Sequence, residues 1–226
     1  VLDVGDYDFG IPSRITARTF MGEGGVIHIE RETDMAGPLH NKGLLTMVGY
    51  LGGNYAQSHP LSMSASLTVE QNYSGVDGDS ASSAELCALL SSLSSLPVNQ
   101  GIAITGSINQ RGEMQPIGGV TEKIEGFFNI CRMQGLTGRQ GVIIPRSNIS
   151  NLMLNDDLIA AVEVGDFNIW AIETVEEALE LLTGVAAGKP NGDGDYPDDS
   201  VHGRVQARLH QFARHKKDHD DDEDDE

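Results

Sequence analysis

Two side chains in this sequence have the types and the settings for peptide-bond chemistry. Ser80 ends the run Gly75-Val76-Asp77-Gly78-Asp79-Ser80, where a loop enters a predicted helix, and Lys123 lies just inside a second predicted helix, after Gly118 and Gly119. A serine hydroxyl with a lysine amine as its base can hydrolyse amides without histidine or metal. We therefore predict Ser80 as a nucleophile and Lys123 as its general base.

The surroundings predicted for Lys123 favour a neutral amine. An ordinary lysine, with a pKa of about 10.4, is almost fully charged at neutral pH and is a poor base. Lys123 lies among the apolar residues Val120, Ile124 and Phe127, and it falls in the first helical turn, where the dipole disfavours a cation. The alternative is a surface lysine in an ion pair, but the positions three and four residues away on the helix hold no acid.

Ser80 also fits a structural role, because serine is a common helix N-cap. The two roles are compatible, since a helix start presents free backbone N–H groups that can hold the oxyanion of a tetrahedral intermediate. We expect the backbone N–H groups of Gly78, Asp79 and Ser80 to form this oxyanion hole.

Other candidate sites have less support. A Ser-His-Asp triad would need His28, His40 or His59, and none of them stands in an informative context. His28, Glu30 and His40 are a possible metal-binding set, but their spacing matches no repeated ligand pattern, so no metal site is predicted.

Two further features are not predicted to be sites. Cys87 falls in mid-helix among apolar residues, which is typical of a core thiol. Gly188-Lys189-Pro190 is not a phosphate-binding loop, because no Ser or Thr follows the lysine, so this chain shows no ATP site.

The elements that must position the two side chains alternate between strand and helix patterns. Apolar alternation and short apolar runs predict strands at residues 15–21, 26–33, 61–69, 102–108, 113–117, 141–145 and 167–172. Helical spacing of apolar residues predicts helices at residues 42–52, 81–96, 120–134, 156–164 and 175–182. The first two strands are joined by a glycine-rich turn, and 102–108 with 113–117 is predicted as a hairpin. Ser82 and Glu85 fit a capping box at the start of the helix after Ser80.

Length and composition limit the class of protein. The 226 residues are 39% hydrophobic, enough for one domain with a buried core, and no run approaches the ~20 apolar residues of a membrane helix. A net charge of −19 repels phosphate backbones, so nucleic acid is a poor partner. Two cysteines form no disulfide framework and favour a reducing, cytoplasmic location. The first residue is Val1, so we expect a piece of a longer protein.

These patterns predict one α+β domain over residues 1–184 and a different segment after it. Residues 185–226 are rich in Gly, Pro and Asp, then basic, then acidic. Such a composition buries too little apolar surface to offset the entropy of ordering, so we expect a disordered acidic tail. Val205, Leu209 and Phe212 leave open a short amphipathic helix that docks or regulates.

Three blocks of the sequence resemble the proteolytic domain of Lon proteases. They are the loop and helix around Ser80, the segment from Gly101 to Ser107, and the segment from Pro116 to Gly126 that carries Lys123. They occur in the family's order, with the family's spacing of 43 residues between serine and lysine. The resemblance covers about residues 10 to 184.

The resemblance implies a compact α+β Lon proteolytic fold and an ATP-dependent serine endopeptidase. Members of the family assemble as hexameric rings, in which an AAA+ motor feeds unfolded protein to the proteolytic sites. Ser80 matches the family nucleophile and Lys123 its base; Thr105 matches the threonine that hydrogen-bonds the lysine, and Asp77 the acid three residues before the serine. ATP and Mg²⁺ belong to the AAA+ module, which this chain lacks and which we expect upstream in the full-length protein.

Some positions depart from the main bacterial branch of the family. Asp79 and Ser82 stand where that branch has Pro and Gly, and Ser66 and Thr68 replace its His-x-His pair. The Gly-Asp-Ser-Ala-Ser form resembles the second branch, and most closely the Lon-like proteases of Gram-negative bacteria. Three alternatives stay open: a non-catalytic Lon-fold assembly module, a domain that is inactive without its motor, and a small-molecule amidase.

Overall fold

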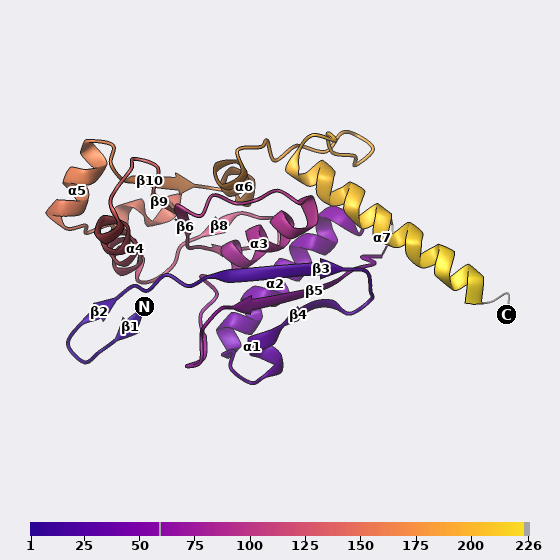
Figure 1. The fold of residues 1–226 in the computed structure, drawn as a ribbon, viewed down its shortest axis with the longest axis horizontal. Helices are drawn as coiled ribbons and strands as arrows, with labels where there is room; N and C mark the ends of the chain where they lie inside the picture. The colour runs from indigo at the N-terminus through magenta and orange to yellow at the C-terminus, as the bar shows by residue number, and fades with distance from the viewer. Residues whose placement is uncertain (59, 224–226) are drawn as a thin grey trace.

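The computed structural model describes residues 1–58 and 60–223, with side chains up to residue 214 except that of Asp3. Helices and strands are mixed along the chain, which confirms the predicted α+β class (Figure 1). The helices are α1 (Ile29–Glu32), α2 (Pro38–Tyr55), α3 (Ser82–Ser94), α4 (Val120–Gln134), α5 (Asp156–Glu163), α6 (Val175–Thr183) and α7 (Val201–Glu223), with a 3-10 turn η1 (Arg146–Asn151). The strands are β1 (Leu2–Asp3), β2 (Asp8–Phe9), β3 (Ile15–Phe20), β4 (Gly25–His28), β5 (Ser64–Val69), β6 (Ile102–Ile104), β7 (Ser107–Ile108), β8 (Met114–Gln115), β9 (Gly141–Pro145) and β10 (Asn168–Ile172).

Two three-stranded sheets form the framework. One has the order β3-β5-β4, with β3 antiparallel and β4 parallel to the central strand; the other has the order β10-β9-β6 and is parallel throughout. The predicted strands at 15–21 and 26–33 are therefore not partners, because β5 lies between them. The second of them ends at His28, where α1 begins.

The strand predicted over 102–108 is divided between two sheets. Its first half, β6, pairs in parallel with β9, so Ile102 lies opposite Gly141. Its second half, β7, forms the expected antiparallel hairpin with β8. The break between the two halves falls at Thr105 and Gly106, and this is the segment that meets the Ser80 loop.

Two hydrophobic clusters are joined by strand β9, which is buried along its whole length. Ile143 packs into the larger cluster, whereas its neighbours Val142 and Ile144 pack into the smaller one around Phe128 and Phe167. Successive side chains of a strand point to opposite faces, so one short strand supplies both cores. In Figure 1, α4, α5 and β10 lie at one end of the molecule and α7 at the other.

Helix α7 departs from the predicted disorder of residues 185–226. Val201, Val205, Leu209 and Phe212 are buried, and the helix packs against α3. The four side chains recur every three or four residues, the spacing of one helix face, so the amphipathic alternative is what the structure shows through residue 214. The average composition of residues 185–226 does not reveal this apolar face. The helix that it packs against, α3, is also remote in the sequence. The acidic residues at 218–226 lie outside the described side chains.

The start of α3 also differs from the prediction. Its N-cap position is Ala81, with no side-chain cap. Instead of forming a capping box, Ser82 Oγ accepts the Ile108 N–H at 3.2 Å, and Glu85 turns into a buried cluster described below. Among the described residues, no helix is long and apolar enough to cross a membrane.

Replacing Phe212 by alanine tests whether α7 is part of the folded domain. Truncating a buried phenylalanine removes apolar contacts and leaves a cavity, so we expect a loss of about 3 kcal/mol in the free energy of unfolding, measured by urea denaturation. Gln211→Ala, at an exposed neighbour on the same helix, is the matched control. Equal stability of the two variants would show that α7 does not pack on the domain.

Candidate active site

The loop that carries Ser80 is attached to the start of α2. Gly37 N–H donates to Val76 O at 2.8 Å, and Val76 N–H donates to Met35 O at 2.9 Å. Asp77 Oδ1 accepts the N–H groups of Leu39 and His40 at 3.1 and 3.2 Å. These are backbone donors in the first helical turn, which have no partner within the helix. Asp77 therefore caps α2 from a distance and fixes the loop on it.

Two glycines on the α2 side allow this close approach. A Cβ at Gly37 would lie 2.2 Å from Asp77 Cγ, and one at Gly43 would lie 3.2 Å from Asp79 Cβ. Within the loop, Gly78 has φ +87°, a left-handed conformation that glycine adopts without strain. The contact between the Ser80 loop and α2 thus needs glycine both in the helix region, at Gly37 and Gly43, and in the loop, at Gly78.

The backbone of Ser80 is held by the break between β6 and β7. Gly106 N–H donates to Ser80 O at 2.9 Å, and Ser83 N–H donates to Gly106 O at 3.2 Å. Thr105 Oγ1 also donates to Ser80 O, at 3.5 Å. The hydroxyl of Thr105 thus contacts Ser80, whereas the resemblance implied a contact with the lysine.

Lys123 enters the site from α4, whose first turns are covered by the segment after β2. Gly10 N–H donates to Glu122 O at 3.1 Å. A Cβ at Gly10 would lie 2.7 Å from Lys123 Cα, and a Cβ at Gly126 would lie 2.1 Å from Gly10 O. The chain and the helix therefore touch through backbone, which removes water from one side of Lys123.

The structure brings the two sequence-predicted side chains together. Lys123 Nζ donates to Ser80 Oγ at 2.9 Å, within hydrogen-bond reach. Burial lowers the pKa of Lys123 from its ordinary value of 10.5, against the opposing charges of Asp79 and Glu122. Desolvation is one of the two causes predicted from the sequence, and it shifts the amine toward the neutral form that a base requires.

A cleft of about 500 Å³ opens at this pair. Most of its wall is apolar, and its polar lining includes Arg14, Asn99 and Gln100 as well as the residues of the site. The side chains that line it include Ser80, Lys123, Thr105, Asp77, Ile15, Ala84, Val98, Ile102, Ile104, Phe127 and Leu182.

One of the three expected oxyanion donors lies near the Asp77 carboxylate. The backbone N–H groups of Gly78, His40 and Leu39 hold the pKa of the Asp77 carboxyl below its usual value. The donor role of Gly78 therefore stays a prediction. The donor roles of Asp79 and Ser80 stay predictions.

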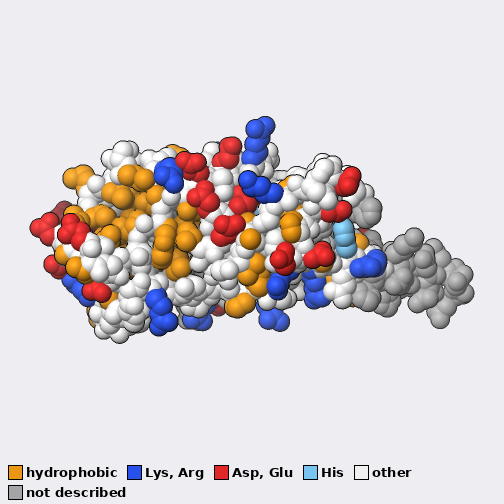
Figure 2. All heavy atoms as spheres, turned by 90° about the horizontal axis from the view of Figure 1, so that it is seen from above, with side chains coloured by type: hydrophobic (Ala, Val, Ile, Leu, Met, Phe, Trp, Pro, Cys, Tyr) orange, Lys and Arg blue, Asp and Glu red, His pale blue; other side chains and the backbone are white. Residues whose placement is uncertain are grey.

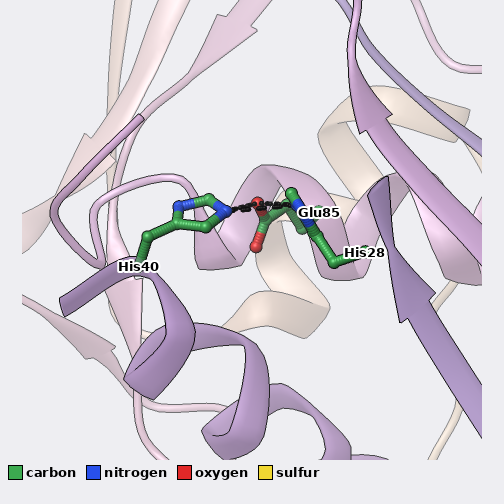
Figure 3. Close-up of side chains that lie close together, drawn as sticks. All are labelled: His28, His40 and Glu85. Carbon is green, nitrogen blue, oxygen red and sulfur yellow. Dashed lines mark hydrogen bonds and ion pairs between the residues drawn. The ribbon is translucent and has the colours of Figure 1, made fainter. Parts of the chain in front are cut away.

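A second polar cluster lies behind the loop, and sequence reasoning found only part of it. His28 and His40, both buried, meet at the carboxylate of Glu85 (Figure 3). Neither histidine contacts Ser80, so neither completes a serine triad, and His59 lies outside the described residues. The sequence interpretation used Glu85 in a capping box, although a carboxylate on the apolar face of α3 was a signal that it needs a buried partner.

Cys87 is a core residue, as predicted. Its side chain is 2% exposed, and desolvation raises the pKa of its thiol to about 12, so a thiolate nucleophile does not form at neutral pH.

Comparisons with known proteins agree with the sequence resemblance. A family model described as the Lon protease (S16) C-terminal proteolytic domain matches residues 61–184. A "Putative Lon protease homolog" of Escherichia coli (strain K12) is 47% identical over 209 residues, covering 92% of this chain and 35% of the relative. An "Archaeal Lon protease" of Thermococcus kodakarensis is 39% identical over 111 residues, covering 49% of this chain and 16% of the relative. The chain spans about a third of the length of the Escherichia coli relative and of a "Putative Lon protease homolog" of Haemophilus influenzae, to which it is 45% identical over 201 residues.

Asp77 offers a test of how the loop is held. Asp77→Ala removes the acceptor for the first turn of α2, whereas Asp77→Asn keeps an oxygen acceptor. We expect faster amide hydrogen exchange at Leu39 and His40 in the alanine variant and near-normal exchange in the asparagine variant. Unchanged exchange in both variants would show that the carboxylate does not hold the loop.

Proposed function

The chain belongs to the Lon protease (S16) family through its C-terminal proteolytic domain, and we propose that it is a serine endopeptidase with a Ser80–Lys123 dyad. The observation that carries the proposal is the 2.9 Å contact between Lys123 Nζ and Ser80 Oγ. The depressed pKa of Lys123, caused mainly by burial, supports it.

In the acylation step, the neutral amine of Lys123 accepts the hydroxyl proton of Ser80 while Oγ bonds to the scissile carbonyl carbon. Backbone N–H groups of Asp79 and Ser80 hold the resulting oxyanion, and Gly78 joins them if its N–H leaves the Asp77 carboxylate. The Lys123 ammonium then gives its proton to the leaving nitrogen as the C–N bond breaks. An ester on Ser80 and a free amine result.

In the deacylation step, Lys123 takes a proton from water as the water oxygen attacks the ester carbonyl. The C–O bond to Ser80 then breaks, and the proton returns to Oγ, which restores both side chains. Thr105 positions the nucleophile through the Ser80 carbonyl, a contact that the structure offers at 3.5 Å.

The substrates we propose are unfolded or damaged proteins presented as extended peptide. An open cleft with a largely apolar wall suits side chains that a folded protein would bury. ATP hydrolysis with Mg²⁺ is assigned to an AAA+ module outside this chain, in a cytoplasmic protein. The length of the relatives leaves room for such a module.

A homo-oligomer, the hexamer of the family, is part of the same proposal. Figure 2 shows hydrophobic side chains gathered at the end of the molecule that carries α5. The exposed apolar residues of η1, α5 and their flanking loops are Ile149, Met153, Ile159, Val162 and Val164. Exposed apolar patches of this kind mark protein–protein contacts.

The alternative is a Lon-fold assembly module without catalysis. Such a module has no need of a nucleophile and a base in contact, and here both are present and joined. The peptidase is therefore the better-supported function.

Single replacements of the dyad test the assignment. We expect Ser80→Ala and Lys123→Met each to reduce cleavage of an unfolded protein substrate by at least about 10³-fold, because neither remaining group can act alone. Circular dichroism and thermal unfolding should show that both variants keep the fold. Cleavage near the wild-type rate by either folded variant would refute the dyad.

The pH dependence of kcat/KM tests the role of the amine. The base must be neutral, so activity should rise with pH through the pKa of Lys123, which lies below 10.5 because the amine is desolvated. Asp79 raises this pKa by its charge, so Asp79→Asn should move the rising limb to lower pH. If the rising limb of the kcat/KM profile has the same position in Asp79→Asn as in wild type, a group other than Lys123 is titrating.

A further inference from the structure

The buried cluster of His28, His40 and Glu85 brings three donor atoms to one point. His28 Nε2 and His40 Nε2 are 3.1 Å apart, and each lies 3.1 Å from Glu85 Oε1. The three side chains are 0–1% exposed. They come from the end of β4, the first turn of α2 and the first turn of α3, and Figure 3 shows both rings directed at the carboxylate.

Hydrogen bonding accounts for this triangle only in part. Glu85 Oε1 can accept an N–H from both rings, but the two Nε2 atoms then face each other at 3.1 Å with no proton between them. The outer nitrogen of His28, Nδ1, lies 3.1 Å from Glu30 Oε2, but neither atom has an aligned hydrogen bond. Buried polar atoms left in this way are costly, and a proton on Nδ1 that serves Glu30 leaves His28 Nε2 with a lone pair suited to a cation.

The triangle has the dimensions of a zinc site. Zn²⁺ lies about 2.0–2.2 Å from imidazole nitrogen and carboxylate oxygen, which places tetrahedral ligand atoms about 3.3 Å apart. The three observed separations of 3.1 Å are close to that value. An ion about 2.05 Å from all three atoms would lie about 1 Å out of their plane and leave room for a fourth ligand on one side.

The groups around the triangle are those that orient metal ligands. The carboxylate of Glu30 faces the outer nitrogen of His28 and is itself held by Thr68 Oγ1 at 2.8 Å and Val69 N–H at 2.9 Å. The backbone of Gly78 lies beside the ring of His40. Metal-binding histidines usually have such a carboxylate or backbone partner on their second nitrogen.

We propose that His28, His40 and Glu85 bind one Zn²⁺ ion, with Glu30 as the residue that orients His28. The three ligands are buried and do not contact Ser80, so we assign the ion to tethering the Ser80 loop. Glu85 lies five residues after Ser80 on α3, and His40 contacts the loop at both Asp77 and Gly78. The ion would therefore fix α2, α3 and the loop to one another, and it takes no part in the chemistry at Ser80.

Zinc content and affinity test the proposal without reference to peptidase activity. The chain, with any affinity tag removed, is equilibrated with Zn²⁺ against a competing chelator and analysed by elemental mass spectrometry. We expect one tightly bound Zn²⁺ per chain. Glu30→Gln should weaken binding by roughly 10–100-fold, as for loss of an orienting partner, and Glu85→Gln or His40→Ala should weaken it more.

Histidines near the C-terminus and the acidic end could bind Zn²⁺ weakly, so the matched control removes them. The triple variant His210→Ala, His215→Ala and His219→Ala should keep the tight site. Co²⁺ should give the strong visible absorption of tetrahedral coordination in wild type and in this control, and not in Glu85→Gln. Zn²⁺ should also raise the thermal midpoint of wild type. This measurement tests the site even if a ligand variant does not fold.

Two results would overturn the proposal. One is a folded wild-type chain that takes up no zinc at about 10 µM free Zn²⁺ and shows no thermal shift. The other is binding by folded Glu85→Gln that equals wild type. Either result would mean that protons alone hold the cluster together.

Discussion

The contact between an amine and a hydroxyl, each at the start of a different helix, is the constraint on which the site depends. Lys123 Nζ and Ser80 Oγ come within 2.9 Å only if α3 and α4 present their first turns to the same cleft. The amine must also be stripped of enough water to favour its neutral form. Gly10 and Gly126 let backbone pack directly on α4 at Lys123, where a side chain would hold the chain and the helix apart.

Helix α3 is the scaffold that connects the functional parts. Ser80 precedes it, Glu85 in its first turn joins the two buried histidines, and its apolar face packs against β3 and α7. The packing of α3 on β3 and α7 therefore bears on the position of both Ser80 and Glu85. The hydroxyl is placed by this helix and by the break between β6 and β7, where Gly106 binds the Ser80 carbonyl.

The loop before Ser80 is held by polar contacts, in contrast to the helices, which are held by apolar burial. Asp77 satisfies the first turn of α2, and the Gly78 backbone contacts His40. The Gly78 N–H lies near Asp77, so a donor role for Gly78 needs this N–H to turn toward the cleft. Gly75 and Gly78 both have positive φ, which gives the loop backbone freedom on either side of Asp77.

The sequence by itself determined most helices, the family and the two side chains proposed as the dyad. Helix α4 was predicted at its observed bounds, because a strong 3.6-residue pattern begins after two glycines and ends before another. Ser80 and Lys123 were found because their chemistry needs local surroundings that a short segment reveals. Only the tertiary structure decided the partners: β5 between β3 and β4, Glu85 with His28 and His40, and α7 on α3. These pairings join residues far apart in the chain, and local propensity and spacing carry no information about which distant surface will bury a given face.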